Sequence, residues 1–240
     1  NNLHGVDLDE RAVQIAQIGL YIKARTHRSR SINHFNVVAS HFVLPEYKEV
    51  SHTFEAGNHF DEQQKRTMAS IWEDLRIAYQ FGSLLRVEEK LDAMMPRNTL
   101  DLFSQSDMQN AFDFRNSFIT NLRNQVENLT GERNNRFTRF KTNNAITFLD
   151  VISQKYDVAV ANPPYTDSAD FGADLKEFIE TNYRKPLKFN TNLYASFIKR
   201  CCELTHEDGK VGMIHPHTFM FIKTFEDVRK FIVEKTHISI

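Results

Sequence analysis

A short apolar run that stops at two consecutive prolines constrains this chain more than any other feature. Residues 156–161 read Tyr-Asp-Val-Ala-Val-Ala, and residues 162–165 read Asn-Pro-Pro-Tyr. Because the run does not alternate between polar and apolar residues, it predicts a parallel strand that is buried on both faces. Neither proline can donate to a sheet ladder, so we expect the strand to end at Asn162. In open α/β sheets ligands bind at the carboxyl ends of strands, which makes the tetrapeptide a candidate site by its position.

The tetrapeptide suits a narrow kind of chemistry. The prolines fix the backbone, so the Asn162 side-chain amide and the Pro163 carbonyl can be aimed without a loss of entropy on binding. These two oxygens can accept both hydrogens of a planar amino group, which makes the nitrogen more nucleophilic. Tyr165 offers a flat face on which an aromatic base can stack. The alternative is a plain corner between a strand and a turn, with Asn162 as a cap and Tyr165 as packing.

The motif resembles the catalytic motif of S-adenosylmethionine-dependent methyltransferases that act on the exocyclic amine of adenine in DNA. Further segments follow in that family's order, namely Lys176-Glu177-Phe178, Asn192-Leu193-Tyr194-Ala195-Ser196-Phe197-Ile198, Gly209-Lys210-Val211-Gly212-Met213-Ile214, Phe219-Met220-Phe221 and Phe225-Glu226-Asp227-Val228-Arg229. The pattern is most similar to the large adenine-specific methyltransferases of BREX phage-resistance systems, and next to restriction-modification methyltransferases. The resemblance covers residues 1–30 and 142–240. It implies catalytic roles for Asn162, Pro163, Pro164 and Tyr165.

A second informative stretch lies at the start of the chain. Residues 3–8 read as a strand, and Asp9 is placed to cap a helix that carries an apolar stripe as far as Ile22. The resemblance implies that Asp7, Leu8 and Asn162 contact the cofactor S-adenosylmethionine, with Asp7 accepting hydrogen bonds from the ribose and Leu8 packing against the adenine. A carboxylate at the tip of a Rossmann-like strand is suited to that role. Alternatively, Asp7 and Asp9 simply share the helix N-terminus, where negative charge is favourable.

Two elements that the family usually carries are not found in these residues. The glycine-rich turn that meets the methionine end of the cofactor is missing, so the sequence reads as a piece of a longer protein. We therefore expect the isolated chain to bind the cofactor weakly and to be inactive. After the expected third strand, at 35–39, the family usually places an Asp that holds the cofactor's adenine amine. Ser40-His41 stands there instead, and Ser40 could supply only a weaker contact.

The predicted fold class is α/β, a Rossmann-like methyltransferase sheet with helices on both faces and a helical insertion. We expect residues 1–44 to form the first part of the core, 45–141 the insertion, and 142–240 the catalytic part. Within the insertion, 62–91 and 112–129 read as amphipathic helices. A basic cluster with interleaved aromatics could touch a phosphate backbone or form a charged helical face: Arg133, Arg136, Phe137, Arg139, Phe140 and Lys141.

Residues near the tetrapeptide give further expectations. Asn143-Asn144 should cap a helix that runs to Ile152, and the polar residues 166–171 should be mobile. The remaining expected elements are helices at 174–183, 193–207 and 225–235, a buried apolar strand at 210–215 after a turn at Gly209, and a strand that begins at 237.

Composition narrows the class of protein. The net charge is −1, which is unusual for a free-standing DNA-binding protein. We therefore expect the main DNA-binding surface to lie outside these residues. The adjacent Cys201 and Cys202 have no second pair, which favours two thiols on a buried helix in a reducing cytoplasm over a disulfide or zinc site. His215 and His217 straddle Pro216, a spacing unsuited to helical metal pairs, and no metal site is expected. The sequence contains no membrane span or signal peptide, so we expect a cytoplasmic protein.

Together these features predict methyl transfer from S-adenosylmethionine to the exocyclic amine of adenine in double-stranded DNA. The target adenine would have to leave the duplex stack, since its amine is paired there. The resemblance implies a role in phage resistance or restriction-modification, alongside other defence-system subunits. Two alternatives remain. One is a protein-glutamine or ribosomal-RNA guanine methyltransferase, whose substrates also present planar amino groups, and the other is a non-catalytic scaffold.

Overall fold

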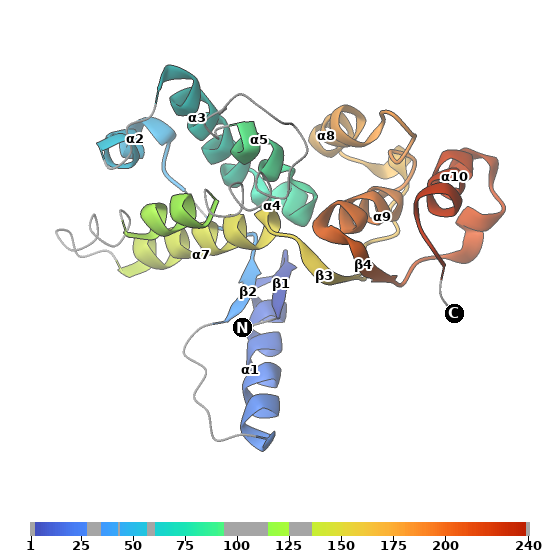
Figure 1. The fold of residues 1–240 in the computed structure, drawn as a ribbon, viewed down its shortest axis with the longest axis horizontal. Helices are drawn as coiled ribbons and strands as arrows, with labels where there is room; N and C mark the ends of the chain where they lie inside the picture. The colour runs from blue at the N-terminus through green and yellow to red at the C-terminus, as the bar shows by residue number, and fades with distance from the viewer. Residues whose placement is uncertain are drawn as a thin grey trace. The chain divides into compact units, whose positions relative to one another are not determined.

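The computed structural model describes residues 3–27, 35–42, 44–56, 61–93, 115–124 and 136–238. These residues form a mixed α/β protein with two small parallel sheets and many helices (Figure 1). The chain divides into two compact units, Asn1–Gln154 and Lys155–Ile240. Among the described residues, no helix is both long enough and apolar enough to span a membrane. The proposed three-part division at residues 44 and 141 stays a prediction.

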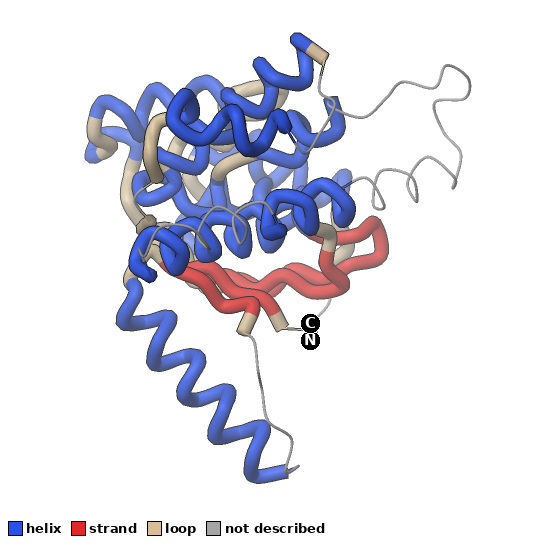
Figure 2. The backbone as a smooth tube through the Cα atoms, turned by 90° about the vertical axis from the view of Figure 1, so that its left-hand side faces the viewer, coloured by secondary structure: helices blue, strands red, loops and turns tan. Residues whose placement is uncertain are grey.

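The first unit contains one strand pair and most of the helices. Its elements are β1 (His4–Asp7), α1 (Glu10–His27), β2 (Asn36–Ala39), α2 (Tyr47–Ala56), α3 (Glu62–Arg76), α4 (Ala78–Phe81), the 3-10 turn η1 (Gly82–Leu84), α5 (Val87–Ala93), a helical stretch at 115–124, and α7 (Arg136–Ser153). β1 and β2 are parallel, with His4 opposite Asn36 and Asp7 opposite Ala39. The strands predicted at 3–8 and 35–39 are therefore confirmed. Figure 1 labels β1 and β2 side by side, and Figure 2 draws the strands in red.

Helix α1 connects the two strands as a crossover. Asp9 caps it as predicted, since its Oδ1 accepts the Arg11 backbone N–H at 2.8 Å. The Gln17 side chain donates to the Val37 carbonyl at 2.8 Å and so ties α1 to β2. The predicted apolar stripe is divided. Val13 is buried, whereas Ile15, Ile18 and Ile22 are exposed.

The core of the first unit is built by helices. In α3 the residues Met68, Ile71, Trp72 and Leu75 are buried at helical spacing, and Asp61 with Gln64 forms a capping box at its N-terminus. The apolar face of α7 is also buried, through Ala145, Ile146, Phe148, Leu149 and Ile152. This packing confirms that the stretches predicted as helical at 62–91 are helical except at short breaks.

Helix α7 and the helical stretch at 115–124 differ in their bounds from the sequence prediction. Asn143 and Asn144 were expected to cap a helix, but α7 already begins at Arg136, so this expectation was wrong. No proline or glycine separates Arg136 from Asn143, and helix propagation costs less than a new nucleus. The predicted 112–129 helix is seen at 115–124. The side chains of the basic cluster at 133–141 lie outside the described residues.

The second unit carries the tetrapeptide. Its elements are β3 (Tyr156–Ala161), η2 (Ser168–Asp170), α8 (Ala173–Tyr183), α9 (Leu193–Leu204), β4 (Thr205–Met213), η3 (His217–Met220), η4 (Lys223–Phe225) and α10 (Glu226–Lys235). β3 and β4 are parallel, and α9 packs against both strands. The predicted helices at 174–183 and 225–235 are confirmed to within a residue at their ends. The expected final strand is not seen at 237–238, and 239–240 lie outside the described residues.

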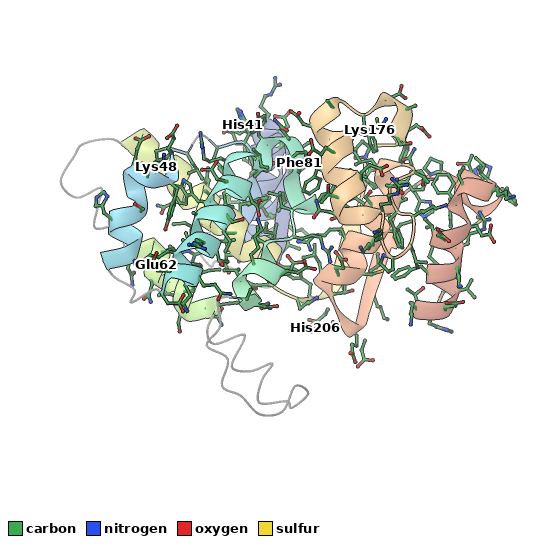
Figure 3. All side chains as sticks on the ribbon, turned by 90° about the horizontal axis from the view of Figure 1, so that it is seen from above. His41, Lys48, Glu62, Phe81, Lys176 and His206 are labelled. Carbon is green, nitrogen blue, oxygen red and sulfur yellow. The ribbon has the colours of Figure 1, made fainter. Side chains whose placement is uncertain are left out.

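The pairing of β3 with β4 is interrupted by a loop within β4. Tyr156 pairs with Thr205, but Val158 pairs with Lys210. Between these two pairs β4 therefore advances by five residues, whereas β3 advances by two. Residues 206–209 form this bulge loop, and His206 is exposed at the edge of the second unit (Figure 3). The expected order of helix, turn at Gly209 and strand was wrong: α9 ends at Leu204 instead of Glu207, and Gly209 already belongs to β4, within its irregular stretch.

The prediction that both strands are buried was wrong. Val158 is 58% exposed and Val160 is 79% exposed, whereas the small Ala159 and Ala161 lie on the less exposed side of β3. In β4, Val211 is likewise exposed. The reason is that side chains alternate across a strand, and among the described residues of this unit only one face of the strand pair is covered, by α9.

The cysteines behave as the sequence predicts. Cys201 and Cys202 are free thiols on α9, with Cys201 buried and Cys202 partly buried. Burial raises the pKa of Cys201 to about 12. Burial also raises the pKa of Cys202. Both shifts favour the protonated thiol over the nucleophilic thiolate at neutral pH.

Candidate active site

The tetrapeptide begins where the sheet ladder ends. β3 stops at Ala161, one residue before Asn162, as the prolines predict. The Ala161 carbonyl accepts the Ile214 backbone N–H at 3.2 Å, which is the last bond between the two strands. Beyond it Asn162 is exposed and Pro163 is buried. The backbone is thereby anchored in the unit while the Asn162 side chain faces solvent.

Tyr165 is held at its hydroxyl and by a ring contact. Its hydroxyl donates to the Ile214 carbonyl at 3.3 Å and lies 3.5 Å from the Asn162 Oδ1, the outer limit for a hydrogen bond. Its ring meets the Tyr194 ring nearly at right angles, with centroids 6.4 Å apart. The side chain is still 48% exposed. Tyr165 therefore combines a fixed position with an accessible surface, which a stacking platform requires.

The segment after the tetrapeptide is fixed, so the predicted mobility of residues 166–171 was wrong. The Leu193 N–H donates to the Thr166 carbonyl at 3.0 Å, and Asp167 forms an antiparallel bridge with Asn192. These backbone bonds to the start of α9 replace the solvent contacts that a polar sequence suggests. Local composition gave no sign of them because their partners lie more than 20 residues away.

Asp7 lies in the first unit at the end of β1. It is exposed, and its Oδ1 accepts the Asp9 backbone N–H at 2.8 Å. The backbone N–H of Arg11, followed by the Arg11 charge, lowers the pKa of Asp9, although the slight burial of Asp9 opposes it. Asp7 therefore does contribute to the helix terminus, as the alternative holds. Its exposed carboxylate also remains accessible to a ligand at the strand tip.

Ser40 and Gly82 are neighbours of Leu8 that the sequence did not identify as a group. Ser40 is fully buried, and its Oγ has no hydrogen-bond partner among the described residues. Gly82 has φ +51°, a left-handed conformation that favours glycine. A Cβ at Gly82 would lie 3.4 Å from the Leu8 Cδ2 and 3.9 Å from the Ser40 Oγ. Gly82, in the helical region, thus places its backbone beside Leu8 and Ser40. Together with Asp7, these two residues lie at the carboxyl ends of β1 and β2.

The predicted site residues therefore fall into two groups. Asn162, Pro163, Pro164 and Tyr165 lie at the end of β3 in the second unit, and Asp7 with Leu8 lies at the end of β1 in the first. Both groups follow the carboxyl end of a parallel strand, the position at which α/β proteins bind ligands.

The whole chain, residues 1–240, matches the family described as Eco57I restriction-modification methylase. The chain belongs to this family. Two curated relatives are both called adenine-specific methyltransferases. One is PglX from Lacticaseibacillus casei (strain Zhang), 24% identical over 235 residues, which span 95% of this chain and 17% of that protein. The other is BrxX from Escherichia coli O9:H4 (strain HS), 23% identical over 250 residues, which span all of this chain and 20% of that protein.

These matches confirm the resemblance to adenine-specific methyltransferases that the motifs predict. This member of the Eco57I methylase family spans about a fifth of the length of the curated relatives it matches. At this level of identity the comparison supports a shared family, and the roles of single residues have to be argued from their own geometry.

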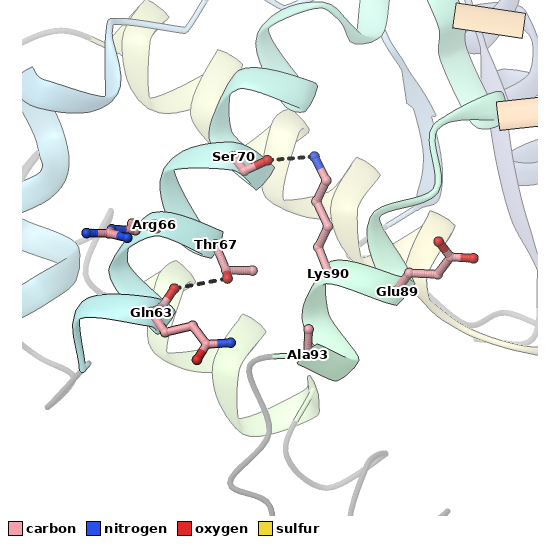
Figure 4. Close-up of a pocket in the computed structure, with 7 residues that line it drawn as sticks. All are labelled: Gln63, Arg66, Thr67, Ser70, Glu89, Lys90 and Ala93. Atoms are coloured by element: carbon pink, nitrogen blue, oxygen red, sulfur yellow. Dashed lines mark hydrogen bonds between the residues drawn. The ribbon is translucent and has the colours of Figure 1, made fainter. Parts of the chain in front are cut away.

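A shallow hollow on the helical part of this family member is a weaker candidate site. It has a volume of about 360 Å³ and lies where α3 meets α5, lined in part by Arg66, Ser70 and Lys90 (Figure 4). The Lys90 ammonium is already bonded to Ser70 and Asp74. Burial raises the pKa of Asp74, although Lys90 opposes the shift. The charge of Lys90 in this hollow is already paired with that of Asp74, and none of the lining side chains named here is arranged for methyl transfer.

A group of possible metal ligands is likewise not found among the described residues. Within the part of the chain that the structure describes, no three His, Cys, Asp or Glu side chains gather closely enough to hold a metal ion. His215, one of the two histidines flanking Pro216, is instead packed among aromatic rings.

Proposed function

We propose that the protein of which this chain is a part transfers a methyl group from S-adenosylmethionine to the exocyclic amine of adenine in DNA. The observation that supports this most directly is the tetrapeptide at the end of β3. It presents an exposed amide at Asn162, a fixed backbone at Pro163 and a half-exposed ring at Tyr165. Membership of the Eco57I restriction-modification methylase family supports the same reaction.

Two acceptors act on the amine. The Asn162 Oδ1 and the Pro163 carbonyl accept its two hydrogens and draw the nitrogen toward a tetrahedral geometry. The lone pair then becomes localised on the nitrogen and available to attack a carbon. As the new carbon–nitrogen bond forms, the bond between the methyl carbon and the sulfonium sulfur of the donor would break and leave its electron pair on the sulfur. The amine then sheds one hydrogen as a proton to water. Because the acceptors are fixed beforehand by the strand end and the prolines, they need no reorganisation during reaction.

Tyr165 acts on the ring of the base. The amine of a paired adenine is hydrogen-bonded within the duplex, so the nucleotide has to leave the stack. A base that has left the stack loses its neighbours, and stacking on Tyr165 replaces part of that loss by about 1–3 kcal/mol. The hydrogen bond from Tyr165 to the Ile214 carbonyl holds the hydroxyl end of the ring without covering its face.

The first unit carries residues that fit the nucleoside end of S-adenosylmethionine. Asp7 offers a carboxylate for ribose hydroxyls, Leu8 an exposed apolar side chain for the adenine face, and Ser40 a buried hydroxyl without a partner. The bound cofactor supplies the methyl group on an electrophilic sulfonium. We also propose a Rossmann-like methyltransferase fold, since parallel strands joined by helices are the units of such folds.

Partners follow from the reaction. The substrate is double-stranded DNA from which one adenine is extruded, and the relatives' family suggests action within a phage-resistance or restriction-modification system with further subunits. The near-neutral charge of this chain does not by itself provide the basic surface that DNA binding usually uses.

The proposal is tested on the full-length protein with duplex DNA and radiolabelled S-adenosylmethionine. We expect labelled N6-methyladenine after digestion to nucleosides. Removing one pre-positioned hydrogen-bonding group typically costs on the order of 100-fold in rate, so Asn162→Ala should abolish detectable product while cofactor affinity changes far less. Thr181→Ala, at an exposed position of α8, is the matched control and should retain activity. Label in protein glutamine or in ribosomal-RNA guanine, with none in DNA adenine, would contradict the proposal.

A further inference from the structure

Behind Tyr165 lies a cluster of aromatic rings with no assigned function. Tyr194, in the first turn of α9, meets Tyr165 at an interplanar angle of 83°. Two other rings stack on Tyr194 in nearly parallel planes. His215 lies 5.6 Å away at 9°, and Phe225 lies 5.4 Å away at 17°. Burial raises the pKa of Tyr194, which the Thr218 hydroxyl partly offsets.

His215 is itself fixed from several sides. Phe219 meets its ring edge-on at 4.7 Å, and its Nδ1 lies 3.1 Å from the Pro216 carbonyl. A carbonyl only accepts, so this nitrogen carries the proton. The loop that continues from His215 is closed by Arg229, whose Nη1 donates to the Phe219 and Ile222 carbonyls at 2.6 and 2.7 Å. The histidine ring therefore belongs to a rigid segment.

The same segment reaches Tyr165 in two ways. The carbonyl of Ile214 accepts the Tyr165 hydroxyl, and the next residue, His215, stacks on the ring that Tyr165 contacts. A hydrogen bond at one end of a tyrosine leaves rotation about that bond free, whereas a second contact on the ring limits it. Together the two contacts fix the plane of the Tyr165 ring and leave about half of the side chain exposed.

We propose that His215 and Tyr194 are positioning residues that set the plane of the Tyr165 ring for stacking on the extruded adenine. This inference rests on the proposed function. Stacking requires two flat rings in nearly parallel planes, so a Tyr165 ring that rocks would hold the adenine, and hence its amine, in a spread of orientations. His215 acts through Tyr194 and does not itself touch the base.

The test uses variants of the full-length protein that distinguish the effect of the aromatic ring at position 215 from the effect of side-chain volume. His215→Phe keeps a flat ring, and His215→Leu keeps apolar volume without one. With duplexes that carry 2-aminopurine at the target position, we expect His215→Leu to weaken the fluorescence rise and to slow single-turnover methylation by about 3- to 10-fold, the range expected for loss of one aromatic pair. His215→Phe should restore both, and cofactor affinity should not change in either variant.

Phe231→Ala provides the matched control. Phe231 meets Phe189 of the same unit edge-on, with centroids 5.1 Å apart and an interplanar angle of 88°, so this variant removes an aromatic pair that does not include Tyr165. It should lower thermal stability and leave both readouts at the wild-type value. Equal losses in Phe231→Ala and His215→Leu, or wild-type rates in His215→Leu, would overturn the positioning role while the methylation proposal stands. A wild-type protein that neither methylates adenine nor raises the fluorescence would overturn both.

Discussion

The side-chain amide of Asn192 joins the start of α9 to Tyr165 of the tetrapeptide. Its Nδ2 donates to the Tyr165 carbonyl at 3.5 Å, and its Oδ1 accepts the Tyr194 backbone N–H at 3.3 Å as the helix cap. One buried residue thus satisfies a helix terminus and a site backbone at once. The position of Tyr165 is therefore tied to the formation of α9.

This link predicts different results for two substitutions at Asn192. Asn192→Ala removes the cap and the link and should destabilise the second unit by about 1 kcal/mol. Asn192→Ser keeps an oxygen for the Tyr194 N–H but cannot reach Tyr165, so it should be nearly as stable as wild type and still methylate more slowly. Urea denaturation and single-turnover methylation measure the two effects. Equal rates in Asn192→Ser and wild type would show that the Tyr165 link has no catalytic role.

Tyr165 should tolerate loss of its hydroxyl but not of its ring. Tyr165→Phe loses the bond to Ile214, worth about 0.5–1.5 kcal/mol net, and should remain active at a reduced rate. Tyr165→Ala loses the stacking face, worth about 1–3 kcal/mol per base, and should lose extrusion of the target base. The fluorescence of 2-aminopurine at the target position reports extrusion. If both variants are equally inactive, the hydroxyl and not the ring is the functional group.

Asp7 should act on cofactor affinity. In the full-length protein Asp7→Ala should weaken S-adenosylmethionine binding by roughly 1–3 kcal/mol, since hydrogen bonds to charged groups fall in that range. The rate at saturating cofactor should change much less. Calorimetry measures the affinity, and Asp9→Ala is the control because it removes the cap of α1 without touching the strand tip. If the two variants lose equal affinity, Asp7 serves only the helix terminus.

His4 should make the stability of the first unit depend on pH. Burial lowers its pKa below the ordinary 6.5, although Asp150 opposes the shift. Its Nε2 lies 3.0 Å from the Asn36 amide nitrogen, a donor that only a neutral ring nitrogen can accept. The unfolded chain therefore binds the proton more readily than the folded chain. Stability is fully present above pH 6.5 and is lost as the pH falls through the lowered pKa of the folded state.

Urea denaturation from pH 8 to pH 5 measures this dependence. His4→Gln removes the titrating group and should flatten part of the decline below pH 6.5. His52→Gln replaces an exposed histidine of α2 in the same unit and should leave the decline unchanged. An identical pH dependence in His4→Gln and wild type would assign the decline to other groups.

Local signals carried most of what the sequence predicted correctly. The prolines at 163 and 164 forced the end of β3, and the carboxylate of Asp9 marked the start of α1. These effects act within a few residues, so composition and spacing are enough to recognise them. The tetrapeptide could be identified as a site for the same reason, since its backbone constraint and its chemistry lie in four adjacent residues.

The predictions that failed depend on partners distant in sequence. Val158 and Val160 have the composition of a buried strand, but the described residues cover only the opposite face. The polar stretch after Tyr165 is fixed by residues at the start of α9. The role of the ring at position 215 also depends on Tyr194, twenty-one residues earlier in the printed sequence, and no periodic pattern connects the two.

The bulge loop at 206–209 gives the second unit a place where chain length can vary. Pairing resumes at Lys210 and continues in register to Met213, directly before Ile214, which receives the Tyr165 hydroxyl. An extra residue inside the bulge would leave that register intact. The same residue added after Lys210 would turn every later side chain to the other face of the strand. A reporter peptide could therefore be inserted in the bulge, provided that Gly209 is kept, since a Cβ there would lie 2.8 Å from the Thr205 Cβ.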